Sequence, residues 1–250
     1  MEADAFAILA VFALLPVSDA LAETAIEQAV DGVRRLRLGR QDSVPFQAFI
    51  DYDFNGASNG VSSWGYSGVA THHFGRQSGS LQYLTPSFGG FKGQVGVQLK
   101  NKAEKDDDGK DVVSGAATYA VAGLSVTAAF QTKEAKGDEN YAGVYGSYDF
   151  GMAKVSLGYH DTKSIKGVTV GAQATVVGIN FGVLYAAQTK NKSSDGEGGT
   201  VSNPKGSAFE LYVNKEVLKG TYAYAEVGNA SKKTAGGKGT GYAVGVIYTF

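Results

Sequence analysis

The chain has 250 residues, a net charge of −1, no cysteine and a mean hydropathy of −0.12. The absence of cysteine excludes disulfides and thiolate metal sites, the balanced charge argues against nucleic acid as a partner, and the low hydropathy excludes a bundle of membrane-spanning helices. With 35 glycines, 14 tyrosines, 13 phenylalanines and only 4 prolines, the composition suits β-strands joined by tight turns.

The first 35 residues differ from the rest of the chain. Residues 5–15 form an apolar run of 11, too short to cross a bilayer as a helix, and Pro16 and the small-x-small sequence of residues 20–22 follow it. We interpret residues 1–22 as a signal-like segment, although Glu2 and Asp4 stand where a secretory signal carries basic residues. Residues 23–35 look helical and mixed in charge, so we expect them to form a segment outside the main domain.

From residue 36 onward, alternating segments of roughly ten residues follow one another. The pattern predicts strands at 36–41, 79–86, 91–100, 112–121, 124–133, 141–150, 153–162, 168–177, 181–190, 207–217, 220–230 and 241–250. The connections alternate between long ones, such as 42–78 and 101–111, and short ones, such as 122–123. Long loops at one end of a sheet and short turns at the other are typical of outer-membrane barrels.

The two faces of each predicted strand differ in chemistry. In 168–177, for example, Val168 and Val170 alternate with Thr169 and Gln173. A soluble sandwich would bury the apolar face, whereas a membrane barrel would turn it toward lipid and keep the polar face in a water-filled lumen. Alternation alone leaves both interpretations open, and the regular strand lengths and sided loops favour the barrel.

The last ten residues form the clearest strand. Tyr242, Val244, Val246, Tyr248 and Phe250 share one face of it. Tilted by about 40°, ten residues span roughly 25 Å, the height of the apolar band of an outer-membrane barrel. The segment resembles the closing strand of bacterial outer-membrane proteins, whose terminal Phe is part of the signal read by the barrel-assembly machinery. The resemblance assigns Tyr248 and Phe250 to that signal.

Three stretches resemble general porins of Gram-negative outer membranes, of the β-proteobacterial type: Leu36–Gln41, Gly79–Gly93 and the final Tyr-Thr-Phe. The resemblance implies an all-β, transmembrane antiparallel β-barrel over residues 36–250. It also implies a homotrimer in the cell outer membrane that passes small hydrophilic solutes and ions by passive diffusion, with outer-membrane lipid around it. Porins of this type have about sixteen strands, of which this chain offers about twelve, so the segment matching the first four is absent.

The resemblance also implies that residues 42–78 are the constriction loop, which folds back into the barrel. The loop is rich in aromatic residues, including Phe49, Tyr52 and Trp64, which favour burial against the barrel wall. We expect opposed charges at the constriction, from Arg37, Arg40, Asp42, Asp51 and Asp53. By strand parity, four further charges face the lumen: Lys92, Lys154, Glu210 and Glu226.

Other motifs carry no chemistry that we can identify. Asp106–Asp108 lacks the ligand spacing of an EF-hand loop, and the adjacent pair His72 and His73 has no Cys or His partners at zinc-site spacing. No nucleophile elbow, catalytic triad or nucleotide-binding glycine motif is recognisable. We therefore expect no metal site, no cofactor and no enzymatic activity.

Three alternatives stay open at this stage. The chain could be a structural or adhesive outer-membrane barrel with no open pore, or a truncated, non-functional porin fragment. An outer-membrane phospholipase needs Ser and His together on the lipid-facing rim, and His160 falls on the lumen face by parity. Single-channel conductance in planar bilayers discriminates an open pore from a plugged barrel or a fragment.

The sidedness of the loops gives a first testable prediction. An epitope tag inserted beside Asp107, in the long acidic connection 101–111, should be labelled by antibody on intact cells, because long loops face the cell exterior. Labelling only after the outer membrane is opened would reverse the topology.

Overall fold

The computed structural model describes residues 26–30, 34–55, 75–99, 110–133, 139–195, 199–234 and 237–249. The signal-like segment, the second half of the predicted constriction loop with Trp64, the acidic tip around Asp107, and Phe250 lie outside these ranges. Within the described residues, no helix is long and apolar enough to cross a membrane.

One antiparallel sheet dominates the described structure. Thirteen strands follow one another in it in chain order, and the short strand β11 pairs antiparallel with the end of β10. The strands are β1 (Ile26–Val30), β2 (Arg34–Asp42), β3 (Arg76–Leu84), β4 (Phe91–Gln98), β5 (Val112–Val121), β6 (Leu124–Gln131), β7 (Tyr141–Asp149), β8 (Ala153–Asp161), β9 (Ile165–Val176), β10 (Ile179–Ser194), β11 (Thr200–Ser202), β12 (Ser207–Leu218), β13 (Thr221–Thr234) and β14 (Gly237–Tyr248). A single described helix, α2 (Val44–Ile50), interrupts the series between β2 and β3.

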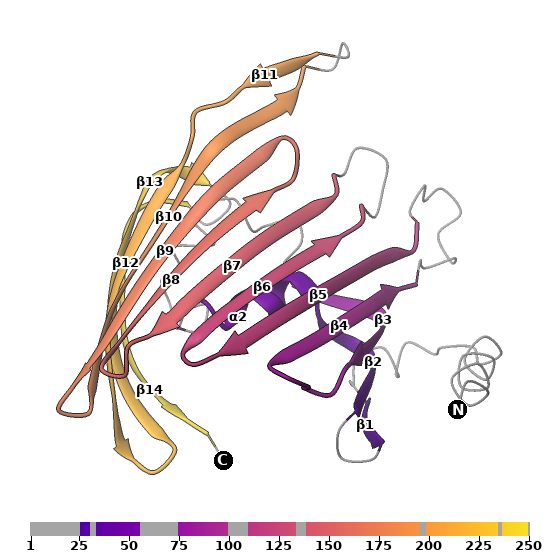
Figure 1. The fold of residues 1–250 in the computed structure, drawn as a ribbon. Helices are drawn as coiled ribbons and strands as arrows, with labels where there is room; N and C mark the ends of the chain where they lie inside the picture. The colour runs from indigo at the N-terminus through magenta and orange to yellow at the C-terminus, as the bar shows by residue number, and fades with distance from the viewer. Residues whose placement is uncertain are drawn as a thin grey trace.

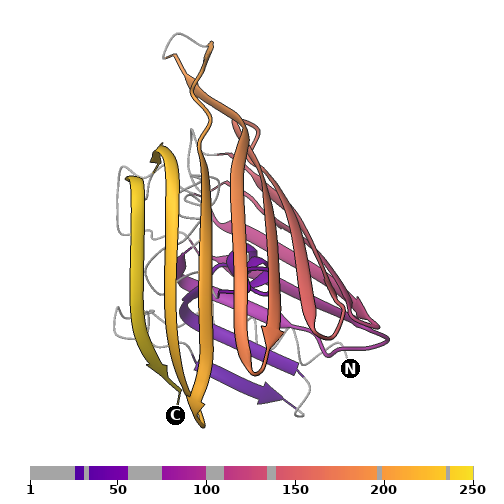
Figure 2. The ribbon, with the colours of Figure 1, turned by 90° about the vertical axis from the view of Figure 1, so that its left-hand side faces the viewer.

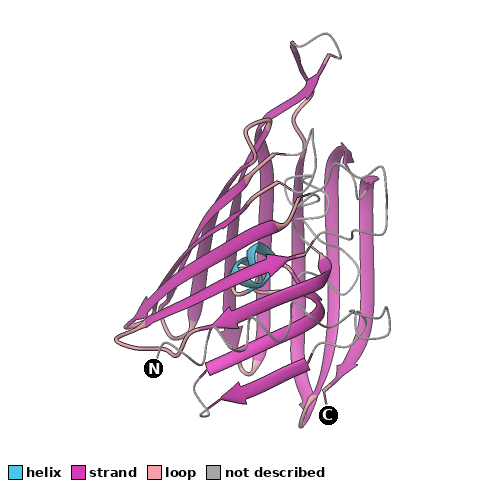
Figure 3. Ribbon diagram, turned by 90° about the vertical axis from the view of Figure 1, so that its right-hand side faces the viewer, coloured by secondary structure: helices cyan, strands magenta, loops and turns pink. Residues whose placement is uncertain are grey.

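The sheet curves into a deep trough, and α2 lies on its concave side (Figures 1, 2 and 3). Consecutive strands pair antiparallel throughout, with continuous registers such as the one between β8 and β9. The two outermost strands in this order are β1 and β14, and the described pairings do not join them to each other. The all-β antiparallel architecture predicted from the sequence is therefore confirmed.

All twelve predicted strands are present, as β2–β10 and β12–β14. The structure differs from the prediction near the N-terminus, where residues 23–35 were expected to look helical. There, Ile26–Val30 forms β1 and pairs antiparallel with β2. The pairing gives the backbone N–H and C=O groups along one edge of β2 hydrogen-bond partners, which local helical propensity does not take into account.

Short turns set the register at one end of the sheet. The turns between β5 and β6 and between β9 and β10 each hold two residues at positive φ: Ala122 and Gly123 (46° and 84°), and Val177 and Gly178 (51° and 71°). Two successive positive φ values define the type I′ turn, whose twist matches the twist of the flanking strands. A Cβ on Gly123 would lie 2.7 Å from the carbonyl oxygen of Asp149, so this turn also packs closely against β7.

Burial along the strands is inverted relative to a soluble protein. The convex face carries large apolar side chains in solvent-accessible positions, such as Leu157 and Val170, which are 63% and 45% exposed. The concave face buries polar side chains, among them Gln82, Thr127 and Glu210. This pattern is the one expected of a wall with lipid on its outside and a polar lumen on its inside.

The inverted pattern gives a prediction for two neighbouring residues of β9. An arginine in place of Val170 should destabilise the protein by about 2–4 kcal/mol, because its charge would enter the lipid. The matched change Gln173→Arg, on the concave face, should cost about 1 kcal/mol, mainly the lost hydrogen bond from the Tyr212 hydroxyl at 2.7 Å. Urea unfolding in lipid vesicles measures both changes, and equal costs at the two positions would contradict the assignment of faces.

Candidate functional site

The segment that enters the trough starts from a capped helix. Ser43 is the N-cap of α2: its hydroxyl accepts from the backbone N–H of Phe46 at 3.3 Å, and Pro45 occupies the first turn. The backbone N–H of Ser43 also donates to the carbonyl oxygen of Gly75 at 2.9 Å. The chain therefore leaves the wall at Ser43 and returns at Gly75, which are directly hydrogen-bonded to each other.

Aromatic rings hold this segment against the wall. Phe49 of α2 and Tyr52 just beyond it both pack on Tyr145 of β7, with ring centroids 5.6 Å apart in each pair. Tyr52 stacks on Tyr145 at an interplanar angle of 22°, and these three side chains form the buried apolar cluster of the described structure. Behind them, the hydroxyls of Tyr141 and Tyr145 hydrogen-bond to each other and to Nδ1 of the buried His160. The predicted burial of Phe49 and Tyr52 is confirmed.

Glycines on the concave face make room for these contacts. A Cβ on Gly96 of β4 would lie 2.9 Å from Cγ2 of Val44, and one on Gly158 of β8 would lie 3.0 Å from the Tyr145 ring. Both distances are too short for an ordinary side-chain contact. The absence of a Cβ therefore lets the wall approach α2 at Gly96, and at Gly158 it leaves room for the Tyr145 ring on which Phe49 and Tyr52 pack.

Tyr52 also ties the segment to the wall through polar atoms. Its hydroxyl hydrogen-bonds to Thr127 at 2.7 Å and to Ser125 at 2.9 Å, both on β6. Its carbonyl oxygen accepts from the hydroxyl of Ser156 on β8 at 2.8 Å. Stacking and three hydrogen bonds therefore converge on one residue, which leaves the backbone at this point little freedom to move.

A second polar attachment lies on the opposite wall of the trough. The side-chain amide of Asn55 donates to the carboxylate of Glu210 on β12 and to that of Glu226 on β13, the latter at 2.8 Å. Both glutamates are buried, as is Asp53, whose carboxylate accepts from the backbone N–H of Asn55 at 3.1 Å. Between Ser43 and Asn55, the chain thus reaches from β2 past β6 to β12 and β13, which crosses the concave face.

A cluster of amides fills the space between α2 and strands β2 to β4. Gln47 of α2 accepts from Arg37 at 2.8 Å and from Gln94 at 3.1 Å, and donates to Gln82 at 2.8 Å. Gln82 in turn donates to the carbonyl oxygen of Asp42 at 2.8 Å. An amide carries both donors and an acceptor, so such a cluster satisfies buried polar groups without adding charge.

The charged residues expected at the constriction lie at separate places in the structure and have different neighbours. The guanidinium of Arg37 contacts Gln47, and Asp42 lies 3.8 Å from Arg76 in an exposed ion pair. Arg40 is exposed and lies opposite a β-bulge, where Ser78 and Gly79 of β3 together oppose this one residue of β2. Partial burial raises the pKa of the Asp51 carboxyl above its ordinary value, and the positive charge of Lys92 opposes that rise. Asp51 and Lys92 therefore lie near enough to interact.

The remaining predicted residues lie along the wall or at the end of the chain. Lys154 pairs with Asp149 at 3.1 Å at the short-turn end of β7 and β8. Glu210 and Glu226 lie together around Asn55. Tyr248, at the end of β14, is 64% exposed on the outer face. In the described part of the chain, no three His, Cys, Asp or Glu residues are arranged to hold a metal ion.

Sequence reasoning missed four residues that build this site: Gln47, Asn55, Tyr141 and Tyr145. Gln47 and Asn55 lie in a loop without periodicity, so no pattern marked their partners across the trough. The signal for the two tyrosines was present, because they occupy the lumen-facing parity of their strand beside His160 and are too large to be left without a packing partner.

The geometry can be compared with known proteins. A profile of the family described as Gram-negative porin matches residues 31–235. Among solved structures, the anion-selective porin from Comamonas acidovorans has a TM-score of 0.69 and 22% identity, over 90% of this chain and 77% of that chain. OmpF of Salmonella typhi, in complex with daunomycin, has a TM-score of 0.68 and 19% identity, over 87% and 75%. OmpT of Vibrio cholerae has a TM-score of 0.59 and 15% identity, over 90% and 80%. No curated protein sequence matches the chain.

The attachment at Tyr52 gives a prediction. Tyr52→Phe keeps the stacking on Tyr145 but leaves the buried hydroxyl of Thr127 without this partner, so it should destabilise the protein by about 1–2 kcal/mol. Urea unfolding in vesicles measures the change. Tyr185→Phe is the matched control on the convex face and should cost less than about 0.5 kcal/mol. A Tyr52→Phe variant as stable as the control would show that the hydroxyl does not anchor the segment.

Proposed function

We infer how the pore works from the premise that this chain belongs to the Gram-negative porin family. Porins are non-enzymatic channels of the outer membrane, and small hydrophilic solutes and ions cross them by passive diffusion. Diffusion through a porin depends on the width of the lumen and on the charges that line its narrowest part. The proposals below concern which residues of this chain set those two properties.

We propose that residues 42–78 narrow the lumen as a constriction loop. The observation that carries this proposal is the pair of attachments on different walls, Tyr52 to β6 and β8, and Asn55 to β12 and β13. A surface loop would stay at the rim, whereas this segment has its helix inside the trough (Figures 2 and 3). Its aromatic packing on Tyr145 supports a fixed position rather than a mobile one.

The charges around this segment support a field directed across the lumen. Arg37 on β2 and Lys92 on β4 lie on one side of the trough, and Glu210 and Glu226 on β12 and β13 lie on the other, together with Asp53 of the loop. Low-dielectric walls focus such a field, which orients dipolar solutes and weights the passage of ions by sign. We propose that Asp51 and Lys154 extend the same arrangement toward the short-turn end, and that Arg40 and Asp42 contribute at the base of the loop.

Three further proposals follow from family membership and the sequence. The chain assembles as a homotrimer in outer-membrane lipid, residues 1–22 act as a targeting segment, and Tyr248 and Phe250 present the assembly signal to the barrel-assembly machinery. Because β1 (Ile26–Val30) already pairs with β2, the sheet begins before residue 36, where the sequence pattern placed the start of the barrel domain. A structural or adhesive barrel with no open pore is the alternative, as is a non-functional fragment. Stepwise conductance of the refolded full-length chain in a planar bilayer supports the open pore, and silence of correctly folded protein contradicts it.

Charge selectivity tests the assignment of the constriction. Arg37→Gln and Lys92→Gln should each shift the reversal potential under a salt gradient toward cation preference, because each removes a positive charge from the narrow zone. Asp51→Asn and Glu210→Gln should shift it toward anion preference. Acidification should also shift the reversal potential toward anion preference. Because the pKa of Asp51 is raised, its carboxylate is protonated at a higher pH than that of an ordinary Asp.

The matched control is Lys215→Gln. Lys215 is exposed near the short-turn end of β12, on the convex parity of that strand, so its charge should leave the reversal potential unchanged. If Arg37→Gln and Lys215→Gln gave the same selectivity, residues 42–78 would not form the constriction.

A further inference from the structure

A cavity lies between the inserted segment and the wall at the short-turn end of the trough. Its volume is about 480 Å³, which is within the range of sites for small organic ligands. The segment lines this short-turn cavity with two residues just beyond α2, and the wall lines it with concave residues of β6, β7 and β8: Asp51 and Phe54, and Ser125, Ser147, Asp149 and Lys154. Side chains from both the loop and the wall can therefore reach a solute held there.

The carboxylate of Asp51 lines the cavity without a direct partner. In the described part of the chain it makes no hydrogen bond and no ion pair, although Lys92 is near enough to act on it electrostatically. Partial burial removes water from this carboxylate, and no protein donor replaces that water. The hydroxyl of Ser147 likewise makes no hydrogen bond to another described residue. Asp51 is therefore an acceptor that a cationic group of a solute would satisfy.

The wall of the cavity offers donors to an anionic group. Asp149 and Lys154 are register partners on β7 and β8, and they form an ion pair at 3.1 Å. Asp149 also accepts from the backbone N–H of Gly151 at 2.8 Å, so each of its oxygens already has a partner. Lys154 uses one of its three N–H donors on Asp149, which leaves two for an acceptor in the cavity.

The charges around the cavity sum to zero. Two are carboxylates and two are ammonium groups: Asp51 and Asp149, and Lys92 and Lys154. A solute with a single charge would gain one attraction and meet repulsion from the groups of its own sign. A solute that carries one charge of each sign, spaced to reach both walls, gains two attractions and complements the cavity best.

The ring of Phe54 gives the cavity an apolar side. It lies over Gly171 of β9, where a Cβ would come within 3.7 Å of the ring carbon Cδ2. The residues near it in the chain fix its backbone, because Tyr52 is bonded to β6 and β8 and Asn55 to β12 and β13. An apolar group of a solute can therefore pack on a ring that is already held in place.

We propose that the short-turn cavity binds a zwitterion of the short-peptide class, with its ammonium group on Asp51, its carboxylate on Lys154 and an apolar side chain against Phe54. The proposal rests on the inward position of residues 42–78 proposed above and adds a class of solute to it. The hydroxyl of Ser147 is available to the peptide bond. Weak binding of this kind retains the solute beside the narrow part of the lumen and still lets it leave.

The test measures binding of the dipeptide glycyl-phenylalanine to the refolded full-length chain in detergent micelles by ligand-observed NMR. Asp51→Asn and Lys154→Gln should each weaken binding at least about five-fold, because each removes a charge-assisted hydrogen bond. The N-acetyl dipeptide lacks the ammonium, so Asp51→Asn should not weaken its binding. The C-terminal amide of the dipeptide lacks the carboxylate, so Lys154→Gln should not weaken its binding.

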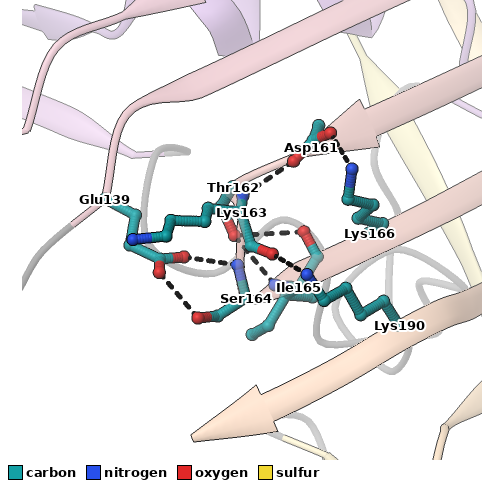
Figure 4. Close-up of polar contacts among 8 residues, drawn as sticks. All are labelled: Glu139, Asp161, Thr162, Lys163, Ser164, Ile165, Lys166 and Lys190. Atoms are coloured by element: carbon teal, nitrogen blue, oxygen red, sulfur yellow. Dashed lines mark hydrogen bonds and ion pairs between the residues drawn. The ribbon is translucent and has the colours of Figure 1, made fainter. Parts of the chain in front are cut away.

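The matched control is Lys166→Gln. Lys166 pairs with its register partner Asp161 on β8, as Lys154 pairs with Asp149, but at the long-loop end of the wall (Figure 4). This pair is on the outer face, because His160, the neighbour of Asp161 in the chain, is buried on the concave side. Lys166→Gln removes the same charge far from the cavity and should change binding of the dipeptide by less than about two-fold.

Three outcomes would overturn the proposal: equal losses in Lys154→Gln and Lys166→Gln, unchanged binding of the dipeptide in Asp51→Asn, or the same loss in Asp51→Asn for the dipeptide and its N-acetyl form. Heat-shifted migration on gels verifies folding of each variant. If Lys154→Gln does not fold, the two probes in Asp51→Asn decide. Binding is measured without ion flow, so a chain that conducts but does not bind contradicts this inference alone, and a folded chain that binds without conducting contradicts only the open pore.

Discussion

Backbone hydrogen bonding is the constraint on which the rest of this structure depends. Inside a hydrocarbon layer, no water satisfies an exposed N–H or C=O, so a chain that crosses with strands must pair each strand with a neighbour on both sides. The unbroken antiparallel order of the described sheet follows from this requirement, and so does the pairing of β1 with β2, where local sequence suggested a helix. Because pairing holds the strands together, the side chains of the two faces can adapt to different surroundings.

The inverted faces leave the protein without a conventional hydrophobic core, and the inserted segment provides a small one. Phe49 and Tyr52 come from the loop and Tyr145 from the wall, and together they form the one buried apolar cluster of the described residues. Gly96 allows the wall to approach α2 closely, Gly158 leaves room for the Tyr145 ring, and hydroxyl groups then satisfy the polar atoms around the rings. The loop is thus positioned by the same kind of packing that stabilises a soluble domain, applied over a small area.

The sequence could predict the parts of this molecule that repeat and could not predict the contacts that cross the trough. Parity identified all twelve strands from β2 onward and the lumen side of residues such as Glu210, because alternation is a local property. It missed that Asn55 bridges Glu210 and Glu226, that Arg37 bonds to Gln47, and that Asp42 faces Arg76. Asn55 and Glu226 are 171 positions apart, and the curvature of the sheet, which no local pattern encodes, brings them together. Arg37 meets Gln47 because α2 folds back into the trough, and Asp42 meets Arg76 because the two are register partners on β2 and β3. The bulge in β3 opposite Arg40 is a similar case, because it shifts the register at one point without changing the strand pattern around it.

Register links the two faces of the wall. Along β8, the inward residues Ser156 and His160 hold the loop and its aromatic cluster, while the outward residues Leu157 and Tyr159 meet the lipid side. A slip of one residue against β9 would exchange the two sets, placing Leu157 and Tyr159 in the lumen and the loop contacts in lipid. Both the constriction and the lipid-facing surface therefore depend on turns that allow only one register. The type I′ turn at residues 177–178, with a positive φ at both positions, is such a device at the short end of β9 and β10. At the long end, the hydrogen bonds of Thr162 and Ser164 close the connection between β8 and β9, so β9, against which β8 takes its register, is fixed at each end.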